Sequence, residues 1–98
     1  MSQTSNWWEI DEVFELNEEG VISLALRELS FLDYCYYDAS CEFEKVLINK
    51  AKVVLGDIIQ TVMKSKCIYS EEIYEKLMEI IHLAVKGVID FSELVVLN

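Results

Sequence analysis

One pair of side chains has a spacing that metal sites use. Glu79 and His82, the chain's single histidine, are three residues apart, which is the Glu-x-x-His spacing of two-metal carboxylate sites in helical bundles. Such a site needs a second pair and two further glutamates, so a dimer would have to form it. Glutamates from other segments that could contribute are Glu28, Glu42 and Glu44.

An ordinary solvated helix face explains the same pair. Glu79 and His82 belong to a continuous polar stripe with helical spacing. Its members are Glu72, Glu75, Glu79, His82 and Lys86. We expect a solvated helix face and no bound cofactor. If a metal site does form, Glu79 and His82 are its candidate ligands.

The thiols offer little support for catalysis. Cys35, Cys41 and Cys67 are an odd number of cysteines in a sequence that starts without an export signal, which predicts reduced, mostly buried thiols. A thiol nucleophile would need His82 beside it, together with an orienting group. The sequence has no phosphate-binding Gly-rich loop and no Cys-x-x-Cys pair. We expect that the protein is not an enzyme.

Tyrosines and carboxylates form the most informative cluster, in the segment 31–38. If the apolar stripe of this segment faces the core, Tyr34 and Tyr37 point outward beside two aspartates. Tyrosine is frequent in interface hot spots because it supplies a large, stiff contact area with a polar tip. The alternative is that the tyrosines line a groove within the chain's own bundle. The candidate partner-binding residues on this side are Asp33, Tyr34, Tyr37, Asp38 and Glu42.

A tryptophan near the start of the chain is a further candidate. Trp7 and Trp8 are adjacent, and a helix cannot direct two neighbouring side chains inward along one line. We therefore expect Trp8 to contact a partner or to lie in a dimer seam.

The net charge lies in the N-terminal part of the sequence. The chain carries 8 basic and 18 acidic residues, a net charge of −10. Residues 1–44 contain eleven acids and one arginine, whereas residues 45–98 contain seven acids and seven lysines. Such acidity favours a basic protein partner and disfavours direct contact with nucleic acid or with anionic membrane surfaces.

The hydrophobic periodicity predicts four helices that position these residues. An Asn6–Glu9 capping box and Gly20 bound a helix over 7–18, and a second helix covers 21–38. Ser40 and Ser70 are the expected N-caps of helices over 41–64 and 71–86, the last of which should end at Gly87. A short helix or a packed tail follows. The fold class is therefore all-α, a compact antiparallel bundle that forms one domain over 1–98.

The apolar stripes give the expected core faces of three helices. The first runs through Ile22, Ala25, Leu26, Leu29, Leu32 and Tyr36. The second runs through Phe43, Leu47, Ala51, Val54, Leu55, Ile58 and Val62. The third runs through Ile73, Leu77, Ile80, Ile81, Ala84 and Val85.

These observations lead to three hypotheses for the function. A small, acidic, helical chain resembles immunity proteins, antitoxins and phage-encoded inhibitors in general profile, although no family motif is present. The resemblance implies a cytoplasmic protein that occludes the active or substrate-binding site of a basic partner, such as a nuclease-like toxin or effector. The second hypothesis is a regulatory or structural module that forms a homodimer or docks another protein. The third is an enzyme or a metal protein.

Overall fold

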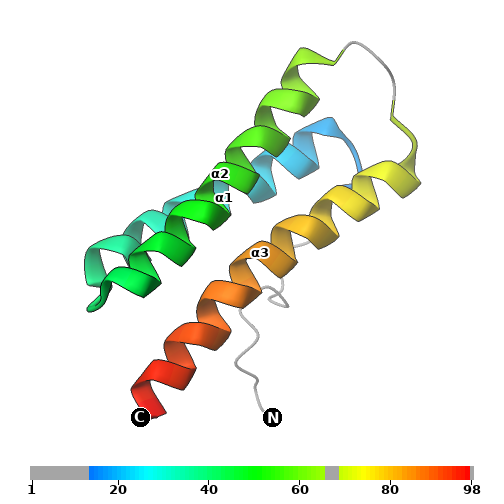
Figure 1. Cartoon of the computed structure of the whole chain (residues 1–98). Helices are drawn as coiled ribbons and strands as arrows, with labels where there is room; N and C mark the ends of the chain where they lie inside the picture. Colours follow the sequence, from blue (N-terminus) through cyan, green and yellow to red (C-terminus); the bar gives the residue numbers. More distant parts are fainter. Residues whose placement is uncertain (1–13, 66–68, 98) are drawn as a thin grey trace.

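Three helices make up the part of the chain that the structure describes. The computed structural model describes residues 14–65 and 69–97, with side chains as far as Glu93. The helices are α1 (Glu18–Asp38), α2 (Glu42–Lys64) and α3 (Glu71–Leu97), and no strand occurs among these residues. α1 and α2 form an antiparallel hairpin, and α3 packs against both (Figure 1). The all-α class is confirmed, but the predicted four-helix bundle is not matched, because the described residues form three helices.

The predicted boundary between the first two helices is wrong. Residues 14–17 are not helical, and Asn17 begins α1 as its N-cap: its Oδ1 accepts a hydrogen bond of 2.8 Å from the Gly20 N–H. Gly20 therefore lies in the first turn of α1 instead of ending a preceding helix. An added Cβ at Gly20 would lie 1.8 Å from the Glu15 carbonyl oxygen, so only glycine fits this approach. The rest of the predicted 7–18 helix lies outside the described residues.

α2 agrees closely with its predicted range of 41–64. Its N-cap is Cys41 instead of Ser40, and the Cys41 side chain makes no capping hydrogen bond. Glu42 and Glu44 lie in the first turn and Lys64 in the last. Both ends therefore complement the helix dipole, which stabilises a helix that lacks a side-chain cap.

α3 continues beyond its predicted end at Gly87. Ser70 caps its start as expected, because the Ser70 Oγ accepts a hydrogen bond of 3.3 Å from the Ile73 N–H. A glycine inside a helix costs about 1 kcal/mol relative to alanine. Burial of Val88 and a Lys86–Asp90 ion pair of 2.9 Å, spaced four residues apart, oppose this cost. The short last helix or packed tail is thus the continuous end of α3.

The core lies where the three helices meet. The buried apolar side chains are Val21, Leu24, Ala25, Leu32, Ile48, Ala51, Leu55, Ile58, Val62, Tyr74, Met78, Ile81, Val85 and Val88. Several residues expected in the core are exposed instead, namely Leu26, Phe43, Val54, Ile73 and Ile80. Each helix carries more apolar residues than one stripe can bury, so the true stripe is rotated from the predicted one and apolar side chains remain on the surface. None of the described helices has the length and hydrophobicity to cross a membrane.

Candidate protein-binding surfaces

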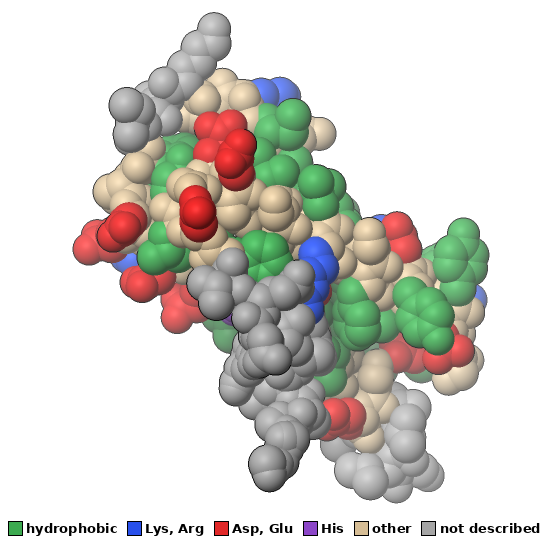
Figure 2. Space-filling model, turned by 180° about the vertical axis from the view of Figure 1, so that it is seen from behind, with side chains coloured by type: hydrophobic (Ala, Val, Ile, Leu, Met, Phe, Trp, Pro, Cys, Tyr) green, Lys and Arg blue, Asp and Glu red, His purple; other side chains and the backbone are tan. Residues whose placement is uncertain are grey.

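The end of α1 and the start of α2 form an acidic-aromatic surface. We give this name to Asp33, Tyr34, Tyr37, Asp38 and Glu42. Tyr34 is 70% exposed and Tyr37 is 89% exposed, so the alternative in which they line an internal groove is wrong. The three carboxylates are also exposed. From behind, the molecule shows red carboxylates in separate groups with green side chains between them (Figure 2).

The acidic-aromatic surface packs against the half-buried Tyr36, which in turn contacts two lysines of α2. The Tyr36 ring meets the Tyr37 ring edge-on, with centroids 6.4 Å apart. The ammonium groups of Lys45 and Lys52 lie 5.9 and 5.8 Å from the Tyr36 ring centroid. Both distances fall within the range of cation–π attraction. These contacts order the Tyr36 ring, whereas Tyr37 meets that ring at one edge and stays largely exposed.

The same lysines partly neutralise the carboxylates. Lys52 forms a salt bridge with Asp33, and the Lys45 Nζ lies 3.8 Å from a Glu42 carboxylate oxygen. Sequence reasoning missed both lysines, because they belong to the half of the chain whose charges cancel. Folding brings Lys52 beside Asp33 of α1, and Lys45 lies three residues after Glu42 within α2. The surface is therefore less negative than residues 1–44 suggest.

Asp38 is the carboxylate of this surface that has no salt bridge within the described residues. It is the last residue of α1, and the last turn of that helix contains no base. A carboxylate at this end of a helix is repelled by the helix dipole, typically by a few tenths of a kcal/mol. A cation from another molecule would relieve this repulsion.

The other sequence-predicted candidates do not join this surface. Trp8 lies outside the described residues. Glu79 and His82 lie on α3, where Glu79 is exposed and His82 is half-buried. No group of three or more His, Cys, Asp or Glu side chains in the described part of the chain is placed to hold a metal ion. Among the described residues of one copy, the pair therefore lacks further ligands.

The environment of His82 lowers the pKa of its imidazole. Burial lowers its pKa, and the nearby positive charge of Arg27 lowers it further. A neutral imidazole is therefore favoured at neutral pH.

The cysteines are less buried than expected. Cys35 and Cys41 are free thiols of intermediate exposure, and Cys67 lies outside the described residues. Burial raises the pKa of Cys35, and the negative charges of Glu44 and Asp38 raise it further. A reactive cysteine needs the opposite environment, one that lowers the thiol pKa. This acidic end of the molecule thus opposes thiolate formation at Cys35.

Glu28 occupies a position that polarity alone did not predict. Its side chain is only 1% exposed, and it is buried beside the core leucines of α1. A buried carboxylate is unavailable to an external metal or partner, so Glu28 contributes neither to the acidic-aromatic surface nor to a metal site.

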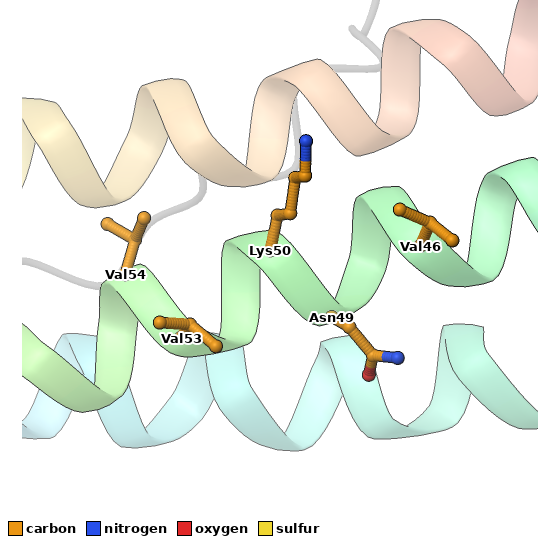
Figure 3. A pocket seen from close by; sticks show the side chains of 5 residues that line it. All are labelled: Val46, Asn49, Lys50, Val53 and Val54. Atoms are coloured by element: carbon orange, nitrogen blue, oxygen red, sulfur yellow. The ribbon is translucent and has the colours of Figure 1, made fainter.

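A second surface runs along the outer side of α2. We call Val46, Asn49, Lys50, Val53 and Val54 the α2 strip; these side chains line an open depression of about 510 Å³ (Figure 3). Lys50 and Val54 lean toward α3, and Asn49 leans toward α1. Val46 and Val53 are 51% and 62% exposed. Because one helix supplies the entire lining, the depression is a shallow seat for another helix and offers little enclosure for a small molecule.

Comparison with protein-family models, with curated proteins and with solved structures found no match for this chain.

Proposed function

We propose that this chain is a small helical binding protein whose acidic-aromatic surface contacts a basic protein partner. One observation carries the proposal: Tyr34 and Tyr37 are largely exposed beside Asp38, at a helix end whose last turn contains no base. Large exposed aromatic side chains are typical of interface hot spots. The unpaired carboxylate provides an attraction for lysine or arginine.

The proposed mechanism is inhibition by occlusion. Lysines and arginines that hold phosphates in a nuclease-like toxin or effector would pair with Asp38 and Glu42, while the two tyrosines fill the site and exclude the substrate. The net charge of −10 would accelerate the encounter with such a partner. This role corresponds to an immunity protein, an antitoxin or another inhibitor, acting in the cytoplasm. It requires no catalytic residue and no cofactor in this chain.

Lys45 and Lys52 refine the proposal. Because they already neutralise Glu42 and Asp33 in part, the aromatic rings and Asp38 carry most of the expected affinity. Exposed salt bridges contribute only about 0.2–1 kcal/mol each, so a partner can replace them at small cost.

The test compares variants of the surface with matched variants elsewhere. The wild type, a Tyr34→Ala/Tyr37→Ala variant and an Asp38→Asn variant are immobilised and exposed to extract of the native host. Leu83→Ala and Glu79→Gln, which change exposed residues of α3, serve as controls. We expect the wild type and both controls to retain one basic protein, and the Tyr34→Ala/Tyr37→Ala variant to retain almost none.

The retained protein is then purified and titrated. We expect wild-type binding to inhibit its activity on nucleic acid and Asp38→Asn to weaken binding several-fold. Equal retention by the wild type and the double tyrosine variant would disprove the role of this surface. Binding without inhibition would disprove occlusion. A toxin or effector encoded beside the gene would identify the partner directly.

The α2 strip supports a second candidate function. Val46, Val53 and Val54 are exposed on the described surface, and exposed apolar patches commonly mark protein contacts. A helical module that self-associates or docks another protein would use this surface. Such a module would not need the tyrosines of α1.

A further inference from the structure

The charges that border the valines of the α2 strip have a particular order. Lys50 and Asp57 are seven residues apart on the exposed side of α2, one on either side of Val53 and Val54. Residues with this separation lie on the same helix face, two turns apart. Neither Lys50 nor Asp57 forms a salt bridge within the described part of the chain. Together with the adjacent Asp57, the strip therefore presents a positive charge, an aliphatic centre and a negative charge along the helix.

This order of charges would let two antiparallel copies of the strip pair, because each charge would then face the opposite charge. A two-fold axis between Val53 and Val54 would bring a second α2 alongside in antiparallel orientation. Lys50 and Asp57 lie at equal separations from that axis, about 5 Å along the helix. Lys50 of each copy would therefore face Asp57 of the second copy, and Val53 would face Val54. Two ion pairs would flank a small aliphatic centre, as in an isologous interface.

The ends of α2 favour the same orientation. Glu42 and Glu44 lie at its start and Lys64 at its end. An antiparallel arrangement brings the basic end of each copy toward the acidic end of the other, and it opposes the helix dipoles. A parallel arrangement would place Lys50 against Lys50 and Asp57 against Asp57. Like charges of this kind act against the parallel pair.

We infer that the α2 strip is the seam of a homodimer in which two α2 helices pack antiparallel about an axis between Val53 and Val54. The occupant of the strip is a second copy of this chain because the charges of the strip match their own reverse. A stable specific interface buries about 1,600 Å² in total. One helix pair provides less area than that, so we expect a dissociation constant of about micromolar or weaker. The seam excludes Tyr34 and Tyr37, so it is independent of partner binding.

Charge-reversal variants test the seam through a heterodimer. The variant Lys50→Asp carries acids at both positions, and the variant Asp57→Lys carries lysines at both. Each should repel its own copy, whereas a mixture of the two restores opposite charges at both contacts. Sedimentation equilibrium of the wild type, each variant and the equimolar mixture measures the association. Lys76→Asp makes the same charge change at an exposed position of α3 and is the matched control.

The expected outcome is a dimer for the wild type and for Lys76→Asp. Each single charge-reversal variant should dissociate about tenfold more readily or remain monomeric, and the mixture should dimerise like the wild type. Circular dichroism verifies that every variant is folded. A wild type that stays monomeric up to about 1 mM would overturn the inference. Single variants that dimerise like the wild type, or a mixture that stays monomeric, would overturn it as well. Loss of partner binding in the tyrosine variants bears only on the proposed function.

Discussion

The acidic-aromatic surface and the α2 strip differ in what could complement them. The first combines two exposed tyrosines with Asp38, and its nearby lysines already pair with Asp33 and Glu42. Its remaining unpaired charge is negative, so the complementary molecule is basic and differs from this chain. The second combines valines with charges of both signs, which match a reversed copy of itself. A surface with charge of one sign requires a foreign partner, whereas an alternating surface can pair with its own copy.

α2 takes part in both surfaces through lysines on opposite sides. Lys45 and Lys52 face α1, where they lie over the Tyr36 ring. Lys50 belongs to the other side of the helix and lies in the α2 strip. All three are lysines of one helix, yet two contact an aromatic ring of α1 and Lys50 forms no salt bridge within the described residues. Their separate roles follow from helix phase.

The largest expected effect is on the free energy of unfolding, and it separates a core residue of α2 from a residue of the α2 strip. Leu55 is fully buried, and Val53, two residues earlier, is 62% exposed. Leu55→Ala should lower the free energy of unfolding by about 2–5 kcal/mol, because it removes buried methyl groups and leaves a cavity. Val53→Ala should change it by only about 0.5 kcal/mol while weakening the dimer. Urea denaturation at a concentration where the wild type is monomeric measures both. A loss of stability of similar size in both variants would show that Val53 belongs to the monomer core.

The next effect concerns ionic strength and separates the two surfaces directly. Raising salt from about 0.05 M to about 0.5 M shortens the range of electrostatic attraction. Association with a basic partner should slow by about tenfold, because the net charge of the chain assists the encounter. The homodimer should weaken less, because both copies carry the same net charge and salt also screens their mutual repulsion. Stopped-flow association rates and sedimentation equilibrium give the two responses. A partner association rate that does not depend on salt would contradict charge-assisted binding.

The bounds of the helices are more predictable from the sequence than the face that each helix buries. α2 was placed to within one residue because acids at its start and lysine at its end agree with its apolar period. The sequence predicts too early an end for α3 at Gly87, because the cost of a glycine, about 1 kcal/mol, is too little to end a helix that still buries Val88. Helix phase was less certain, since Leu24 and Leu26 in α1 both belong to apolar stripes and only tertiary packing selects Leu24.

The candidate surface was predictable in part. The outward direction of Tyr34 and Tyr37 followed from the apolar stripe on the opposite side of α1, and the structure places both at the surface. The pairing of Lys52 with Asp33 could not be predicted, because it depends on how α2 folds back along α1. The pairing of Lys45 with Glu42 is a local contact three residues apart within α2, which helical spacing alone could have indicated. The aliphatic side of α2 was also missed. The apolar stripe predicts a core position for Val54 and does not include Val46 or Val53, whereas the structure exposes all three.

The smallest effect concerns pH and a residue of α3 that belongs to neither surface. His82 has a pKa below its usual value of about 6.5, caused by burial and then by Arg27. The unfolded chain therefore binds the proton more readily than the folded chain. The stability that His82 contributes is fully present above about pH 6.5 and is lost as the pH falls through its lower folded pKa.

We expect the urea midpoint of the wild type to fall modestly from about pH 7.5 to about pH 5.5, and that of His82→Gln to fall less. The acidic-aromatic surface contains no histidine, so we expect folded protein to retain its affinity for a basic partner across this range. The α2 strip contains no histidine either, so we expect the proposed homodimer to retain its affinity as well. Measured together, the midpoints and the two affinities separate a change in the fold from a change at either surface. Equal pH dependence in the wild type and His82→Gln would show that another group controls stability in this range.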